Sequence, residues 1–404
     1  LLGYDDFASF KLETEMAGTP DAVRDLLMRV WAPALTQARA DAEALEEMLH
    51  ADGHNGPLQP WDWRHYSERR RQALHDFDEA ALKPYLSLDA MIEAAFDAAG
   101  RLFGLAFRPL AATLHHPDAR AWEVTRAGRH MGVFVGDYFA RSGKRSGAWC
   151  STFRGQRKLG GDVRPIVINV CNFAKGAPAL LSWDDARTLF HEFGHALHQL
   201  LSDVEHPSVA GTSVARDFVE LPSQLFEHWL EEAPVLARLT HVETGAAIPE
   251  ALLERMRDAR TANSGFETVE FVSSAILDMD YHSQPMDGSV ADFEKMVLDG
   301  IGMPAEIGLR HASTHFLHLF AGDGYAAGYY SYLWSEVLDA DGFGAFKEAG
   351  DPFDPATAER LYDYVYSAGG KRDFAEAYRL FRGRDPQVGA LLEDRGLVTA
   401  AAGG

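Results

Sequence analysis

The stretch SWDDARTLFHEFGHALHQLL, from Ser182 to Leu201, decides how this 404-residue chain folds around its candidate site. Ser182 predicts a helix N-cap, and Asp185 three positions later completes a shortened capping box. Apolar residues then recur at the helical period: Ala186, Leu189, Phe190, Phe193, Leu197, Leu200 and Leu201. The stretch therefore predicts a long helix with one face buried in a core.

The middle of this helix carries His191 and His195 with Glu192 beside the first histidine. Residues four apart share a helix face, so both imidazoles can bind one metal ion, and His198 falls on the same face. Glu192 lies about 100° around the helix from His191, where it misses the metal but reaches a water molecule next to it. Such a carboxylate can take a proton from water that attacks a carbonyl. Gly194, which costs about 1 kcal/mol against alanine inside a helix, indicates close approach of another backbone or a ligand.

The bare histidine pattern is not decisive by itself. With 17 histidines in the chain, it arises by chance in about one such chain in twenty. The alternative is a helix with two surface histidines. A well-formed helix whose histidines lie opposite its apolar stripe favours the metal site.

A catalytic zinc ion takes three protein ligands and leaves one position open. The third ligand is expected from residues 215–229, which have an apolar stripe and a polar side. The candidates on the polar side are Asp217, Glu220, Gln224 and Glu227. Spacing alone does not choose among them, and an exposed helix face is the alternative for all.

The rest of the chain predicts a mainly α fold with one small mixed or antiparallel sheet. Helices are expected at 20–49, capped by Thr19, at 61–81 and at 88–103, and again from Ser182 almost to the end. The strands are expected at 106–111, 120–125, 131–138, 148–153 and 165–170. We therefore expect a helical region at 1–104, a small β-sheet region at 105–181 and a helical zinc-binding region at 182–404.

Composition limits the function. The formal charge is −22, from 60 acidic and 38 basic residues, which argues against nucleic acid or an anionic membrane as partner. The densest basic run, residues 69–71, is expected to be a solvated helix face. The 2 cysteines, Cys150 and Cys171, form no disulfide framework and favour a reducing, cytoplasmic compartment. The chain opens at Leu1 without a methionine, so we expect that residues are missing upstream.

Two segments carry a family resemblance: HEFGHALH at 191–198 and GTSVARDFVELPSQ at 211–224. They resemble the M3 family of zinc metallopeptidases, and within it the bacterial peptidyl-dipeptidase branch more than the oligopeptidase A branch. The resemblance runs from residue 1 to about 398. It implies a zincin-like metallopeptidase catalytic region, with one zinc ion and Glu220 as the third zinc ligand.

A second family motif is GDGYAAGYYSYLW at 322–334. The resemblance implies that Tyr325 and Tyr332 act at the scissile bond, that Tyr329 and Gly324 bind substrate, and that His318 is the histidine found just before this loop. Spacing alone is ambiguous, because three tyrosines at i, i+4 and i+7 also form an ordinary core stripe.

Other residues have simpler explanations. His311 and His315 share a helical face with His318, but no acid follows at the zinc-motif spacing, so we expect solvated or core histidines. Lys144 and Arg145 can bind a peptide carboxylate, although a turn before a strand explains them as well. The strand at 148–153 is our expected sheet edge, on which a peptide can add as a further strand.

These observations predict zinc-dependent hydrolysis of short peptides with release of C-terminal dipeptides. The alternatives are an endo-acting oligopeptidase of the same family and a non-catalytic, zinc-retaining peptide-binding fragment. The resemblance implies that family members are usually longer, with an upstream helical region that walls off one side of the substrate channel, and we expect that region to be absent or not shown here. We expect a monomer whose partners are short peptides, with neither nucleic acid nor membrane involved.

Overall fold

The computed structural model describes residues 2–397, and these residues fold as two compact units. Unit 1 takes in residues 1–77, 251–337 and 387–404, and unit 2 takes in residues 78–250 and 338–386. Residue 1 and residues 398–404, at the ends of the first and third expected regions, lie outside the described part. Each unit therefore combines segments that are far apart in the sequence, and the division into three regions stays a prediction.

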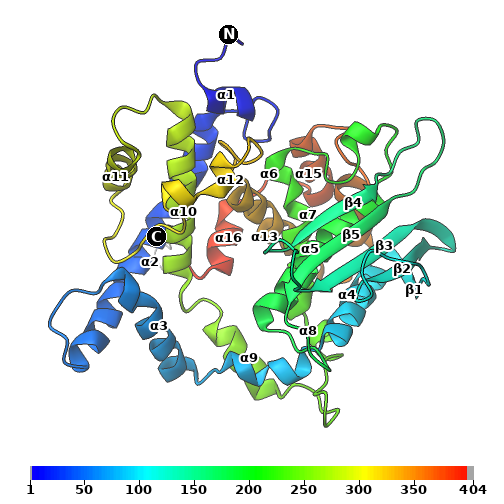
Figure 1. Cartoon of the computed structure of the whole chain (residues 1–404), viewed down its shortest axis with the longest axis horizontal. Helices are drawn as coiled ribbons and strands as arrows, with labels where there is room; N and C mark the ends of the chain where they lie inside the picture. Colours follow the sequence, from blue (N-terminus) through cyan, green and yellow to red (C-terminus); the bar gives the residue numbers. More distant parts are fainter. Residues whose placement is uncertain (1, 398–404) are drawn as a thin grey trace. The chain divides into compact units, whose positions relative to one another are not determined.

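Unit 1 is built on the long helices α2 (Pro20–Ala51) and α10 (Ser264–Ser283), which pack along each other (Figure 1). Thr19 caps α2 as predicted, because its hydroxyl accepts the Ala22 N–H at 3.2 Å. Gly265 permits the close packing, since a Cβ there would lie 2.7 Å from the backbone nitrogen of Ala38. The other helices are α1 (Phe7–Leu12), α3 (Pro60–His75), α9 (Glu250–Ala259), α11 (Val290–Ile301), α12 (Leu317–Phe320), the first part of α13 (Ser331–Ala349) and α16 (Val388–Asp394).

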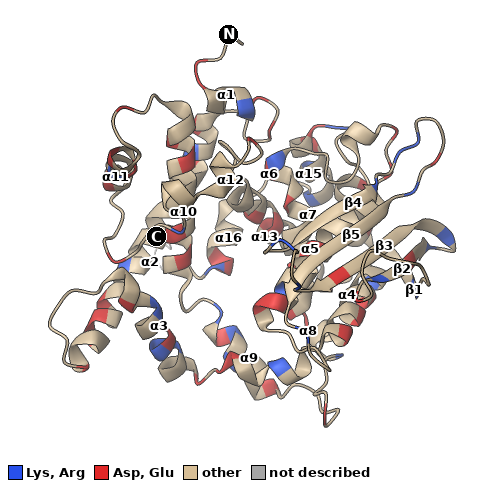
Figure 2. Cartoon of the chain, in the orientation of Figure 1, with Lys and Arg blue, Asp and Glu red and all other residues tan. Residues whose placement is uncertain are grey.

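The end of helix α3 differs from the predicted boundary. It ends at His75, well before the predicted end at residue 81, because Asp76 adopts a left-handed conformation with φ of 47°. Figure 2 shows acidic and basic residues interspersed along α3. The basic run pairs with acids of the same unit: Arg69 with Asp52, Arg70 with Asp41 and Arg71 with Glu68. This run is therefore a charge-paired helix face.

Unit 2 contains a five-stranded sheet in the order β1-β2-β3-β5-β4. Its strands are β1 (Leu105–Pro109), β2 (Arg120–Arg126), β3 (Arg129–Phe139), β4 (Trp149–Arg154) and β5 (Ile166–Phe173). All five were expected within a few residues. The sheet is mixed, because β3 and β5 are parallel and the other neighbours are antiparallel. Strand β4 lies at the edge, as predicted.

The helices of unit 2 are α4 (Leu88–Phe103), α5 (Trp183–Leu201), α6 (Arg216–Val219), α7 (Leu221–Glu231), α8 (Ala233–Leu236), the rest of α13, α14 (Pro355–Leu361) and α15 (Phe374–Arg382). Of these, α4 and α5 pack against strands of the sheet. Short helical turns lie at Glu79–Ala81, Lys83–Tyr85, Pro207–Val209 and Tyr362–Tyr366.

Helix α5 packs against β3, β4, β5, α4 and α7 (Figure 1). The ring of Phe193 fixes this packing from the buried face of α5. Its centroid lies 5.2 Å from that of Phe134 on β3, 5.7 Å from that of Phe107 on β1 and 5.4 Å from that of Phe96 on α4. The architecture is thus mainly helical with one small mixed sheet. Among the described residues, no helix combines the length and apolarity needed to cross a membrane.

Candidate metal centre

Helix α5 begins as its sequence predicts. The Ser182 hydroxyl accepts the Asp185 N–H at 3.0 Å, and the Asp185 carboxylate accepts the Ser182 N–H at 3.1 Å. The close approach indicated by Gly194 comes from α7. A Cβ on Gly194 would lie 2.6 Å from the carbonyl oxygen of Pro222 and 2.6 Å from the Cα of Ser223. Because Gly194 has no side chain, the start of α7 can lie close to the part of α5 that carries the two histidines.

Glu220 lies at the junction between α6 and α7, ending one helix and starting the next. Pro222 in the first turn of α7 has no N–H to lose, which suits a helix start. The Glu220 side chain is buried, and the Ser223 hydroxyl donates to its Oε2 at 3.0 Å. This interruption of the expected continuous helix directs the carboxylate toward α5.

The side chains of His191, His195 and Glu220 converge. The Oε2 atom of Glu220 lies 3.4 Å from Nε2 of His191 and 3.0 Å from Nε2 of His195. One potential ligand atom from each residue lies within 4.8 Å of the others. Burial opposes ionisation of Glu220, but the charge of His195 and hydrogen bonds from both histidines outweigh it and hold the pKa of the carboxyl well below its usual value.

Glu227 on α7 supports the first histidine. Its Oε1 lies 2.6 Å from Nδ1 of His191, which leaves Nε2 to face Glu220. Glu227 also pairs with Arg187. Burial works against the charge on Glu227, but Arg187 and the contact with His191 outweigh it and lower its pKa to about 2. A carboxylate on the far nitrogen of a metal-ligating histidine orients the ring and strengthens it as a donor.

Glu192 is next to His191 in the sequence but is not one of the three converging residues. Its side chain is buried, and its Oε2 has no hydrogen-bond partner among the described residues. Burial raises the pKa of this carboxyl, although the charges of His191 and His195 oppose the shift. A buried carboxylate with an unused oxygen suits a group that exchanges protons with a bound water.

His198 was expected on the same helix face as His191 and His195, but it lies in the core. It is fully buried, and neither ring nitrogen has a hydrogen-bond partner within the described part of the chain. Burial lowers its pKa to about 3. The ring lies against Tyr366, with centroids 6.3 Å apart. His198 is therefore a neutral core residue, because α5 has core on more than the one predicted side.

The expected tyrosines and His318 gather in unit 1. The centroid of the His318 ring lies 5.7 Å from that of Tyr325 and 5.5 Å from that of Tyr329. The rings of Tyr325 and Tyr332 stack, with centroids 5.5 Å apart and planes within 7°. Desolvation and the charge of Arg310 lower the pKa of His318, which favours its neutral form. Gly324 has open space where a Cβ would be.

This cluster is not the helical stripe that the spacing allowed. Helix α13 begins at Ser331, so Tyr325 and Tyr329 precede it in turns. Likewise His311, His315 and His318 do not share one helix, because His315 ends a short turn and only His318 lies on α12. His315 is exposed, as the solvated alternative predicted.

Asp278 of α10 holds the turns that carry the tyrosines. It is fully buried, and its carboxylate accepts the N–H of Ala327 at 2.9 Å and the N–H of Tyr329 at 2.8 Å. Ala327 has a positive φ of 55°, a conformation that needs such support. Sequence analysis missed Asp278, although an acid within the apolar run AILDM was a usable signal.

Residues 1–397 match the model of peptidase family M3. The chain belongs to this family. Among curated relatives, it is 39% identical over 98% of its length to a protein named dipeptidyl carboxypeptidase from Escherichia coli. It is 36% identical over 98% of its length to a protein named oligopeptidase A from the same organism. The chain spans 60% of the length of each of these relatives.

A solved structure shares the fold of this M3 chain. It is titled an M32 carboxypeptidase from Deinococcus radiodurans R1, with a TM-score of 0.50 and 15% sequence identity. The match covers 96% of this chain and 70% of that one. It supports the zincin-like architecture that the resemblance implied.

Family M3 implies a metal ion, and the residues of unit 2 fit one. Two imidazole nitrogens and one carboxylate oxygen converge in a buried position, the usual donor set of a three-ligand catalytic site. The far nitrogen of His191 is already held by Glu227. Sequence analysis named Glu227 only as a possible ligand, because its contact with His191 depends on how α7 packs on α5.

Proposed function

We propose that this M3 chain hydrolyses peptide bonds in short peptides and releases dipeptides from their C-termini. His191, His195 and Glu220 would hold one zinc ion. When bound, zinc would polarise the scissile carbonyl and make water more acidic. The observation that carries the proposal is the convergence of these three side chains beside the buried, partly unpartnered Glu192.

The chain's own groups take the following roles in this proposal. Glu192 accepts a proton from the attacking water and later gives it to the leaving amine. Tyr332, Tyr325 and His318 donate hydrogen bonds to the tetrahedral intermediate, and Tyr329 and Gly324 bind substrate. The assignment of these five residues of unit 1 rests on the family resemblance.

The peptide would pair with the free side of β4 as an added strand. This edge is available because β4 has β5 on one side only within the five-stranded sheet. The proposal includes a monomer in the cytoplasm whose partners are short peptides. Two free cysteines, Cys150 and Cys171, agree with a reducing compartment.

The test is mass spectrometry of the products from a pentapeptide with a blocked N-terminus, with and without a chelator. The proposal predicts chelator-sensitive release of the C-terminal dipeptide. Absence of cleavage by zinc-loaded protein would contradict it and favour a peptide-binding module.

An endo-acting oligopeptidase is the second candidate, because a relative named oligopeptidase A is 36% identical. Amidation of the substrate's C-terminus separates the two activities. A dipeptidyl carboxypeptidase loses activity toward the amide, whereas an oligopeptidase retains it.

A further inference from the structure

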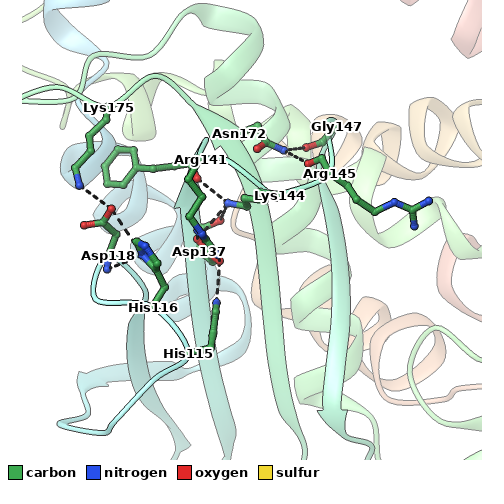
Figure 3. Close-up of polar contacts among 11 residues, drawn as sticks. His115, His116, Asp118, Asp137, Arg141, Lys144, Arg145, Gly147, Asn172 and Lys175 are labelled. Atoms are coloured by element: carbon green, nitrogen blue, oxygen red, sulfur yellow. Dashed lines mark hydrogen bonds and ion pairs between the residues drawn. The ribbon is translucent and has the colours of Figure 1, made fainter.

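The loop between β3 and β4 is held by a buried ionic group that we call the Asp137 cluster: Asp137, His115, Arg141 and Lys144 (Figure 3). Asp137, near the end of β3, is 2% exposed. Arg141 donates to its two carboxylate oxygens at 2.6 and 2.7 Å. Nε2 of His115 lies 2.8 Å from the same carboxylate. The loop is therefore fixed at its base.

Lys144 is fully committed to this cluster. Its ammonium group donates to Oδ1 of Asp137 at 3.1 Å, to the Asp137 carbonyl at 2.9 Å and to the Phe139 carbonyl at 2.8 Å. Its side chain is 5% exposed. An ammonium group has three donors, and all three have partners here. Lys144 is thus a structural residue and is not available to a ligand.

Arg145, the next residue, has the opposite character. Its backbone is fixed, because the Asn172 side-chain amide donates to the carbonyls of Arg145 and Gly147, each at 2.7 Å. Its side chain is exposed and extends away from the Asp137 cluster (Figure 3). The guanidinium makes no hydrogen bond or ion pair with the residues that the structure describes. A rigid loop therefore presents one free guanidinium directly before the edge strand β4.

Helix α5, which carries the candidate catalytic carboxylate Glu192, packs against β4 and β5. Burial raises the pKa of the Cys150 thiol, and the nearby Glu192 charge raises it further. The same two causes raise the pKa of Cys171. Cys150 is the second residue of β4, and the pairing of Trp149 with Val170 places Cys171 level with the start of that strand. The packing of α5 and the two pKa shifts agree that Glu192 lies beside β4 and β5.

Strand geometry then selects an end of β4. A strand advances about 3.3 Å per residue, so a two-residue leaving group spans about 7 Å. Gly147 and Arg145 lie three and five residues before Cys150, in the turn that leads into β4. At the opposite end, the Nε of Arg154 already donates to the Arg164 carbonyl at 2.9 Å. The Arg145 end of β4 thus has the free cation that a dipeptide carboxylate requires.

We propose that the Arg145 guanidinium binds the C-terminal carboxylate of the peptide substrate, an inference that rests on the proposed function. The peptide runs antiparallel to β4, which places its C-terminus at the Gly147 end and uses the more stable strand pairing. A guanidinium can bind a carboxylate through two parallel hydrogen bonds. Because the loop is rigid, it fixes the number of residues between that carboxylate and the scissile bond.

The test compares zinc-loaded full chains carrying Arg145→Gln, Arg145→Lys or Arg157→Gln with the parent. The substrates are a blocked pentapeptide with a free C-terminus and its C-terminal amide. Arg145→Gln should lower kcat/KM for the free acid about 10- to 100-fold, mainly through KM, and leave the amide unchanged. Arg145→Lys should restore part of the preference for the acid. Arg157, also exposed but beyond the other end of β4, is the matched control and should change neither substrate.

The outcomes separate this inference from the proposed function. If the parent chain cleaves and Arg145→Gln keeps the full acid-over-amide preference, the assignment of Arg145 is wrong and the peptidase activity stands. If the zinc-loaded parent chain cleaves nothing, the proposed function is wrong. In that case equilibrium binding of fluorescent acid and amide peptides to the parent and to Arg145→Gln still decides the inference. Equal loss of preference in Arg157→Gln would also contradict it.

Discussion

The metal centre and the Asp137 cluster are two buried carboxylate sites of unit 2 that satisfy their charges differently. Asp137 faces two permanent cations, Arg141 and Lys144, and Lys144 is itself buried. Glu220 is similarly buried, but it faces the imidazoles of His191 and His195 and the hydroxyl of Ser223. An imidazole carries a positive charge only when it is protonated, and when neutral it offers a nitrogen atom that can bind a metal.

This difference explains why the metal centre would need a metal ion and the Asp137 cluster would not. A buried carboxylate is costly unless a cation offsets its lost hydration. Asp137 has that cation within the protein and acts as structure. Glu220 has only imidazoles as charged partners among the described residues, and their charge depends on protonation, so a divalent cation could take the place of those protons. The next five predictions test this contrast, first at the metal centre and then at the Asp137 cluster, and at each from the largest expected effect to the smallest.

His195→Ala should remove the metal. Deleting one of three ligands leaves a site that competes poorly with water, so bound zinc should fall from one ion per chain to near zero and peptide cleavage should cease. Metal analysis after dialysis measures this. Asp137→Asn is the control and should keep its zinc. Zinc retained by His195→Ala would contradict the assignment of His195 as a metal ligand.

Glu192→Gln should separate metal binding from turnover. The amide keeps the size of the side chain but cannot accept a proton, so kcat should fall about 10²- to 10⁴-fold while zinc stays bound. Parallel metal analysis and product analysis measure both quantities. A variant that cleaves at the parent rate would exclude Glu192 as the proton acceptor.

Glu227→Gln should weaken the zinc site without destroying it. Loss of the carboxylate behind His191 should lower zinc affinity about 10- to 100-fold, as measured by competition with a chelator. Glu231→Gln on the same helix is the matched control and should leave affinity unchanged. Equal effects in both variants would assign the loss to α7 as a whole.

Asp137→Asn should act on stability instead of metal binding. Removing the carboxylate leaves the Lys144 ammonium buried beside Arg141, so the free energy of unfolding should fall by about 3–5 kcal/mol at neutral pH. Denaturant unfolding of both proteins without zinc measures this loss. An unchanged denaturant midpoint of unfolding would mean that solvent compensates for the lost Asp137 carboxylate.

The same pair of proteins has a defined pH dependence. Burial opposes ionisation of Asp137, but Arg141, His115 and Lys144 outweigh it and hold the pKa of the carboxyl far below its usual range. A lowered folded-state pKa contributes stability above the unfolded pKa of about 4, and this contribution is lost as pH falls toward the folded pKa. The difference between parent and Asp137→Asn should therefore be full at pH 7 and shrink below about pH 4.

Local patterns in the sequence predicted the elements well, as two examples show. The capping pair Ser182 and Asp185 predicted the start of α5, and the β-rich composition of residues 148–153 predicted β4. Both depend on neighbours within a few residues. The predicted helix at 61–81 was too long, because the chain turns at Asp76. The helical stripe that spacing left open for the tyrosines does not form, because α13 begins only at Ser331.

The sequence by itself determined the candidate ligand pair on α5, because four-residue spacing on a helix is a local property. Only the tertiary structure shows the break at Glu220 that turns one of the four candidate side chains toward those histidines, and the packing that places Glu227 behind His191. It also decided that Lys144 is buried while Arg145 is free, although the two are adjacent. These outcomes depend on contacts between segments far apart in the chain, and a local period does not encode such contacts.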